Sequence, residues 1–128
     1  MASLLCICDQ GYRASIEEQD DTVVWMAHML QRDDNTNAAL VLRHSAVNYA
    51  HRGQQPAGVT FGDWTQSHPA DFPRDLASFL ADGGKVYALT EDVEQHGLAD
   101  ADLIDGVEQL KREALAGLVA EYDLLSFW

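Results

Sequence analysis

A chain of 128 residues with 47% hydrophobic and 23% charged residues has the size and composition of one globular domain, which excludes wholesale disorder, collagen-like repeats and a disulfide scaffold. Its 21 acidic residues outnumber 8 basic ones and give a formal net charge of −13, a field that repels nucleic acid and anionic membranes. Because no apolar run is long enough to span a bilayer and the start has no basic leader or cleavage site, we expect one domain, 1–128, in the cytoplasm.

Short apolar runs alternate with amphipathic stretches in the first half of the chain. The run Leu4 to Cys8 is too short for a helix and is typical of a strand buried on both faces. A capping-box pattern at 15–18 predicts a helix that continues to about Arg32, and its second half, 23–30, is apolar almost all round. A second buried strand is predicted at 38–42.

The second half continues the alternation. A short helix is predicted at 45–52, and a long loop follows from 54 to about 68. Apolar residues at helical spacing predict a helix from Asp71 that ends before Gly83. The remaining predicted elements are a strand at 85–89, a short helix capped by Thr90, a strand at 107–110, a helix at 115–122 and a strand at 124–128.

This order of elements predicts the fold class. Strands that alternate with helices form mostly parallel sheets, because parallel neighbours need right-handed crossovers that place helices on the faces. We therefore expect a three-layer α/β/α domain with a mostly parallel five-stranded sheet, flavodoxin-like in appearance. Ligands bind such sheets outside the carboxyl ends of the strands.

Polar side chains follow several of the predicted strands at that edge. We expect them to form an acidic pocket that favours a cation or a hydrogen-bond donor. No glycine-rich phosphate motif is present, and neither a metal nor another cofactor is expected. The candidate ligand-binding residues are Asp9, Tyr12, Arg13, His44, Glu91 and Asp92.

The two cysteines, Cys6 and Cys8, lie on the first predicted strand. Residues two apart on a strand point to the same face in a geometry that is poor for a disulfide, so we expect thiols. Cys8 is the candidate catalytic residue, because a following helix start and Arg13 would stabilise its thiolate. The alternative is that both thiols pack as small buried hydrophobes.

The segment from Gly84 to Leu98, GKVYALTEDVEQHGL, followed by a short strand, a helix and the final Trp128, resembles the carboxyl half of the DsrH/TusB branch of the DsrE/DsrF/DsrH superfamily. That branch reads V-Y-A-L-x-E-D-x-x-x-R-G-L, and this sequence departs from it at His96. The amino half is similar to the general DsrE pattern, with Cys8-Asp9 before a long helix and Leu42-Arg43-His44-Ser45-Ala46-Val47 before a short one.

The resemblance implies a small α/β/α subunit of trimers, hexamers or mixed complexes with paralogous DsrE-type subunits, whose relatives pass persulfide sulfur in sulfur relay. Sulfur-carrying branches place a cysteine near the end of the third strand, where this chain has Leu89-Thr90-Glu91. The resemblance therefore favours a non-catalytic accessory subunit over an enzyme. Two alternatives stay open, a persulfide carrier that uses Cys8 and a small-ligand binding module.

An assembling subunit needs a surface for its partners, and the helix with apolar residues on both faces supplies a candidate. The alternative is that these side chains lie under the long loop. The predicted interface residues are Trp25, Met26, Met29 and Trp64.

Overall fold

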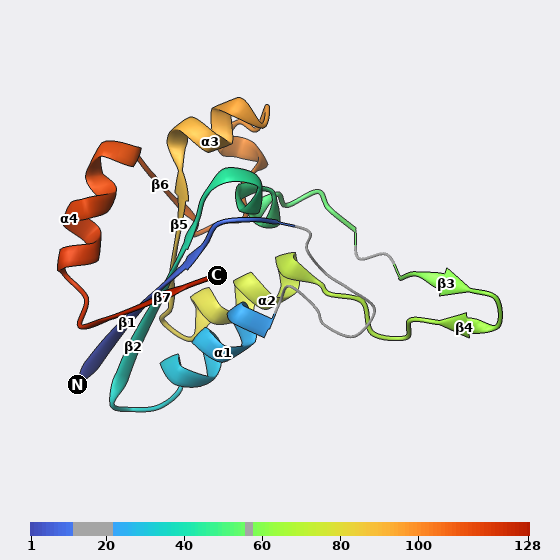
Figure 1. Cartoon of the computed structure of the whole chain (residues 1–128), viewed down its shortest axis with the longest axis horizontal. Coiled ribbons are helices and arrows are strands. Elements are labelled where there is room, and N and C mark those ends of the chain that lie inside the picture. Colours follow the sequence, from blue (N-terminus) through green and yellow to red (C-terminus); the bar gives the residue numbers. More distant parts are fainter. Residues whose placement is uncertain (12–21, 56–57) are drawn as a thin grey trace.

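A sheet of five parallel strands forms the centre of the computed structural model, which describes residues 1–11, 22–55 and 58–128 (Figure 1). The strand order is β6-β5-β2-β1-β7, and every neighbouring pair is parallel. The strands are β1 (Ala2–Cys8), β2 (Thr36–Leu42), β5 (Lys85–Leu89), β6 (Glu108–Leu110) and β7 (Leu124–Phe127). The predicted α/β fold with a five-stranded parallel sheet is confirmed.

Helices cover both faces of the sheet, but unequally. The described α-helices are α1 (Thr22–Gln31), α2 (Phe72–Ala81), α3 (Thr90–Gln95) and α4 (Leu115–Ala120). Three short 3₁₀ segments accompany them: η1 (His44–Ala50), η2 (Asp100–Asp102) and η3 (Arg112–Ala114). Figure 1 shows α4 on one side of the sheet, whereas α1 and α2 lie on the other.

This asymmetry follows from the strand order. The chain steps in one direction from β1 to β2, β5 and β6, then returns past β1 to place β7 at the opposite edge. Right-handed crossovers in one direction lie on one face of a sheet, and the reversed crossover lies on the other. Of the described helices, the six-residue α4 is consequently the one that covers the second face.

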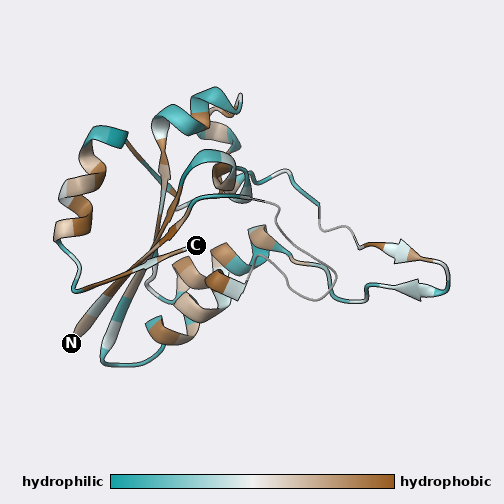
Figure 2. Ribbon diagram, in the orientation of Figure 1, coloured by the Kyte–Doolittle hydropathy of each residue, from teal (hydrophilic) through white to brown (hydrophobic). Residues whose placement is uncertain are grey.

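Two hydrophobic clusters reflect the two faces. The larger cluster lies under α1, α2 and η1 and contains Cys6, Leu40 and Phe79. The smaller one, under α4, contains Leu5, Val41 and Leu118. In Figure 2 the hydrophobic colour is concentrated on the strands and on the helices that pack against them.

Local chemistry explains the ends of α2. The Asp71 carboxylate accepts a hydrogen bond from the Arg74 N–H at 3.3 Å, which caps the helix start, and Pro73 lies in the first turn. At the other end Gly83 adopts a φ of 92°, a conformation that costs other residues free energy. The boundaries predicted from Asp71 and Gly83 therefore match the structure.

Several predicted elements differ in detail. The predicted loop 54–68 contains a hairpin of β3 (Thr60–Phe61) and β4 (Trp64–Thr65), which Figure 1 shows extending away from the sheet. A turn at Gly62 and Asp63, with Gly62 at a φ of 56°, joins its strands. Thr90 is the first residue of α3 rather than its cap, and Leu89 precedes the helix without a side-chain cap. The start of the helix predicted from residue 15 lies outside the described residues.

Among the residues that the structure describes, no helix combines the length and apolar character needed to cross a membrane.

Candidate functional site

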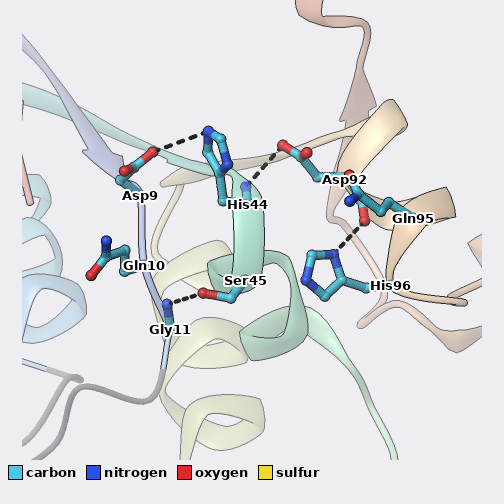
Figure 3. A pocket seen from close by; sticks show the side chains of 8 residues that line it. All are labelled: Asp9, Gln10, Gly11, His44, Ser45, Asp92, Gln95 and His96. Carbon is cyan, nitrogen blue, oxygen red and sulfur yellow. Dashed lines mark hydrogen bonds and ion pairs between the residues drawn. The ribbon is translucent and has the colours of Figure 1, made fainter.

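A pocket of about 390 Å³ opens at the carboxyl edge of the sheet, where ligands bind in this class of fold. Segments from three places in the sequence line it: the residues after β1, the start of η1 and the side of α3 (Figure 3). Three of its residues, Asp9, His44 and Asp92, are predicted from the sequence. The complete lining is Asp9, Gln10, Gly11, His44, Ser45, Asp92, Gln95 and His96.

Asp92 anchors this pocket. Only 2% of the Asp92 surface is exposed, and both of its carboxylate oxygens accept a hydrogen bond. One accepts a hydrogen bond from the His44 backbone N–H at 2.8 Å, and the other accepts one from Arg112 Nη2 at 2.9 Å. The Asp92 carboxylate therefore points inward and holds another segment, so its role goes beyond that of a first-turn acid that complements the helix dipole.

The residue held by Asp92 has an unusual backbone. His44 adopts a φ of 52°. Among the described residues, it is the one non-glycine residue whose backbone lies in the left-handed region. That conformation costs an ordinary residue free energy and persists only where its surroundings impose it. Here the hydrogen bond from His44 N–H to Asp92 supplies the constraint, and the His44 side chain remains 61% exposed at the pocket.

Asp9 forms the opposite wall. Its Oδ1 accepts a hydrogen bond from Arg43 Nε at 2.6 Å and lies 3.4 Å from His44 Nε2. Asp9 and Asp92 are thus each paired with an arginine. The pocket is less negative than the sequence predicts, since the prediction counted these carboxylates without Arg43 and Arg112.

Gly11 lets the ends of β1 and β2 approach closely. Its N–H donates to Ser45 Oγ at 2.8 Å, and a Cβ at this position would lie 2.7 Å from the Ser45 carbonyl oxygen. A side chain would push the two walls apart, which explains the single glycine in this turn. Gly11 and Ser45 were not predicted as site residues.

The remaining predicted ligand-binding residues are not part of the described pocket. The Glu91 carboxylate accepts a hydrogen bond from the Arg112 backbone N–H at 2.9 Å. This hydrogen bond lowers the pKa of the Glu91 carboxyl below its usual range. Tyr12 and Arg13 lie outside the described residues. His96, which the sequence reading did not assign to the site, lines the pocket with its Nδ1 2.9 Å from the Asp92 carbonyl oxygen.

Both cysteines lie inside the protein. Cys6 is 0% and Cys8 is 1% exposed, they are not joined in a disulfide, and neither is among the residues that line the pocket. Burial, followed by the nearby Cys8 thiol, raises the pKa of Cys6 to about 11. Because a thiolate is the reactive form, the raised pKa of Cys6 and the burial of both side chains favour the packing interpretation.

Within the described ranges, no cluster of three or more histidine, cysteine, aspartate or glutamate side chains is arranged to hold a metal ion.

The predicted interface residues differ in exposure. Trp25 is 62%, Met29 38% and Trp64 44% exposed. Met26 is partly buried and packs against the larger hydrophobic cluster, so its side chain belongs in part to the core. Trp25 and Met29 lie one turn apart on α1, and together they leave an apolar strip on its outer side.

Comparison with solved structures identifies the fold. The crystal structure of the ychN protein from E. coli matches with a TM-score of 0.78 and 20% identity over 100% of both chains. The chain has the fold of YchN. A protein of unknown function, MTH1491 from Methanobacterium thermoautotrophicum, matches with a TM-score of 0.70 and 11% identity over 98% of this chain and 99% of that one. No family model and no curated protein sequence matches.

Both YchN and MTH1491 have a DsrE/TusB-like fold. The fold implied by the resemblance to the DsrE/DsrF/DsrH superfamily is therefore confirmed. Membership of the DsrE/DsrF/DsrH superfamily and the assignment to its DsrH/TusB branch stay predictions.

Proposed function

We propose that this chain is a non-catalytic accessory subunit of a cytoplasmic DsrE-type assembly that takes part in sulfur relay. Its partners are further copies, in a trimer or hexamer, or paralogous subunits that carry the reactive cysteine. The observation that carries this proposal is the apolar strip on α1, where Trp25 remains 62% exposed. Contiguous exposed apolar side chains mark interaction sites, and Trp25 and Met29 lie one turn apart on the same side of α1.

The arrangement of the thiols supports the accessory role. Residues Leu89, Thr90 and Glu91 occupy the carboxyl end of β5, where sulfur-carrying relatives are expected to hold a cysteine. Cys8, the alternative carrier, is 1% exposed. A persulfide carrier must present its sulfur to both donor and acceptor, and this geometry does not.

Charged residues on α1 will reduce the size of the assembly. We expect Trp25→Glu combined with Met29→Glu to give a smaller mass than the wild type in light scattering after size exclusion, because burying carboxylates in an apolar interface is costly. Folding should change by no more than about 0.5 kcal/mol, since both side chains are at the surface.

A matched control adds the same charge elsewhere. Ala77 and Ser78 are exposed on α2, and replacing both with glutamate should leave the mass unchanged. A wild-type monomer, or an α1 variant with the wild-type mass, would contradict assembly through this strip.

The pocket favours a second function, the binding of a small molecule. The supporting observation is the left-handed His44 backbone, because strain of this kind clusters at functional sites. With both carboxylates paired, the exposed imidazole and the Gln10 and Gln95 amides are left to bind a ligand by hydrogen bonds. We propose a small polar ligand that offers hydrogen-bond donors to these groups.

His44→Gly separates binding from folding. Glycine accepts a positive φ without steric cost, so the unfolding temperature of the ligand-free variant should equal or exceed that of the wild type. The stabilisation by ligand, measured as a thermal shift with a panel of small organic amines, should disappear. If no amine shifts the wild type, or if His44→Gly keeps the shift, the pocket is not such a binding site.

A further inference from the structure

We propose that β7 is a self-pairing edge, through which two copies of this chain join their sheets by antiparallel β7–β7 pairing about a two-fold axis at Ser126. The inference names one partner and one contact for the assembly and in that respect rests on the proposed function. It concerns a different surface from the α1 strip.

The backbone of β7 has one side free. Among the described residues, β7 is the last strand of the sheet and pairs with β1 alone. The Trp128 N–H donates to the Ile7 carbonyl, and the Trp128 carbonyl accepts from the Asp9 N–H, each at 2.8 Å. Because backbone groups alternate in direction along a strand, Leu125 and Phe127 direct their N–H and C=O groups outward, away from β1.

The side chains of this edge are apolar on both faces of the sheet. Leu124 is 57%, Leu125 54% and Phe127 58% exposed, and Figure 2 draws most of β7 in the hydrophobic colour. Register with β1 places Leu125 and Phe127 on the α4 face, opposite Leu5 and Ile7. Among the described residues, the hydrophobic cluster under the six-residue α4 does not include Leu125 or Phe127.

Natural proteins protect sheet edges with charges, prolines or covering segments. The stretch from Leu124 to Trp128 contains no charged residue and no proline, in a chain with a net charge of −13. The Arg43 guanidinium lies 4.8 Å from the centre of the Phe127 ring and is paired with Asp9. An uncharged edge lowers the electrostatic repulsion between two identical, strongly acidic chains.

The edge is complementary to itself. With Ser126 on a two-fold axis, Leu125 lies opposite Phe127 of the second copy, and these are the residues whose N–H and C=O groups point outward. They form the hydrogen-bonded pairs of an antiparallel ladder, whereas Ser126 faces its own copy in a non-hydrogen-bonded pair. Leu124 then lies opposite Trp128 on the α1 face. Such an interface is isologous and closes after two copies.

The apolar surface that this pairing could bury fits a dimer of moderate affinity. The exposed parts of Leu124, Leu125, Phe127 and Trp128 amount to roughly 450 Å² per copy, compared with about 800 Å² per partner in a standard interface. Strand pairing adds backbone hydrogen bonds to this apolar contact. We therefore expect a dimer contact in the micromolar range.

Cysteine cross-linking tests the predicted axis. The test uses Ser126→Cys in a Cys6→Ala background. In the proposed dimer the Cα atoms of the two Cys residues, one from each copy, lie about 4.5 Å apart, within the range that a disulfide spans. Mild oxidation should give a covalent dimer at least ten-fold faster than Ser78→Cys, an exposed thiol on α2. A cross-linking rate no greater than that of Ser78→Cys would overturn the proposal.

A charge variant supplies the second measurement. Leu125→Lys with Phe127→Lys should raise the dissociation constant of this contact by roughly 100-fold or more, measured by sedimentation velocity, because like charges would face each other across the axis. The circular dichroism spectrum confirms folding. A dissociation constant equal to that of the wild type would overturn the proposal.

The experiments distinguish failure of the β7 inference from failure of assembly through α1. If β7 pairs as proposed, Trp25→Glu with Met29→Glu should still cross-link through Ser126→Cys. If that cross-link is absent from every variant but the α1 substitutions still reduce the mass, assembly through α1 stands and the β7 inference is wrong. If the cross-link forms but the α1 substitutions leave the mass unchanged, the β7 contact stands and assembly through α1 is wrong.

Discussion

Native protein will react with iodoacetamide at least about 100-fold more slowly than the urea-unfolded chain, because reagent reaches a buried thiol only when the structure opens. Cys6 and Cys8 are 0% and 1% exposed, and burial raises the pKa of Cys6 to about 11. The rate should therefore rise toward alkaline pH and show no plateau near neutrality. Mass spectrometry of alkylated peptides separates the two sites.

Ser78→Cys is the matched control for this prediction, since residue 78 is exposed on α2 and should react at the rate of a free thiol. Rapid alkylation of native Cys8 near neutral pH would contradict the accessory role and favour the persulfide-carrier alternative.

The same thiol predicts an alkaline loss of stability. The pKa of Cys6 is raised from 9.0 in the unfolded reference to about 11 in the folded protein, so the folded state retains the proton more strongly. The corresponding contribution to stability is fully present below pH 9 and is lost as pH rises toward the folded value. In Cys6→Ala, the fall in the urea midpoint over this alkaline range should be smaller.

Asp92→Ala will lower the free energy of unfolding by about 2 kcal/mol, because it leaves the His44 N–H without its acceptor and removes the constraint on a left-handed backbone. Arg112 contributes less to this loss, since its side chain is 53% exposed and can return to water. Urea denaturation followed by circular dichroism measures the change.

Two substitutions locate the cause of this effect. Asp92→Asn keeps an oxygen that can accept from His44 N–H, so we expect it to lose only about half as much stability as Asp92→Ala. Glu94→Ala removes an exposed carboxylate from the same helix and should change stability by no more than about 0.5 kcal/mol. Equal effects of Asp92→Ala and Glu94→Ala would show that the buried carboxylate does not hold the pocket.

The sequence predicted the sheet well because its signals are local. The strand at 85–89 coincides with β5, and a short apolar run from Val86 to Leu89 that ends at Thr90 leaves little choice of element. The alternation of elements was sufficient to predict parallel pairing, since few topologies satisfy right-handed crossovers. The hairpin at 60–65 was missed because strands of two residues each carry no periodic signal.

The site was predicted less completely because its contacts join distant residues. Asp9 and Arg43 are 34 positions apart, and Asp92 and Arg112 are 20 apart, so neither pairing leaves a local pattern. Asp92 lies in the first turn of α3, where a surface acid is common, and only the approach of η1 reveals that the carboxylate is buried. The positive φ of His44 has no sequence signal at all, because glycine or asparagine is the usual residue there.

The positions of the three tryptophans determine how the protein can be observed. Trp25, Trp64 and Trp128 are 62%, 44% and 37% exposed, and they lie on α1, on the outlying hairpin and beside the edge strand. None is in either core cluster, so the indole emission of an isolated subunit should resemble that of an indole in water. Contact with another subunit, rather than folding, is the event that would shift this emission to shorter wavelength.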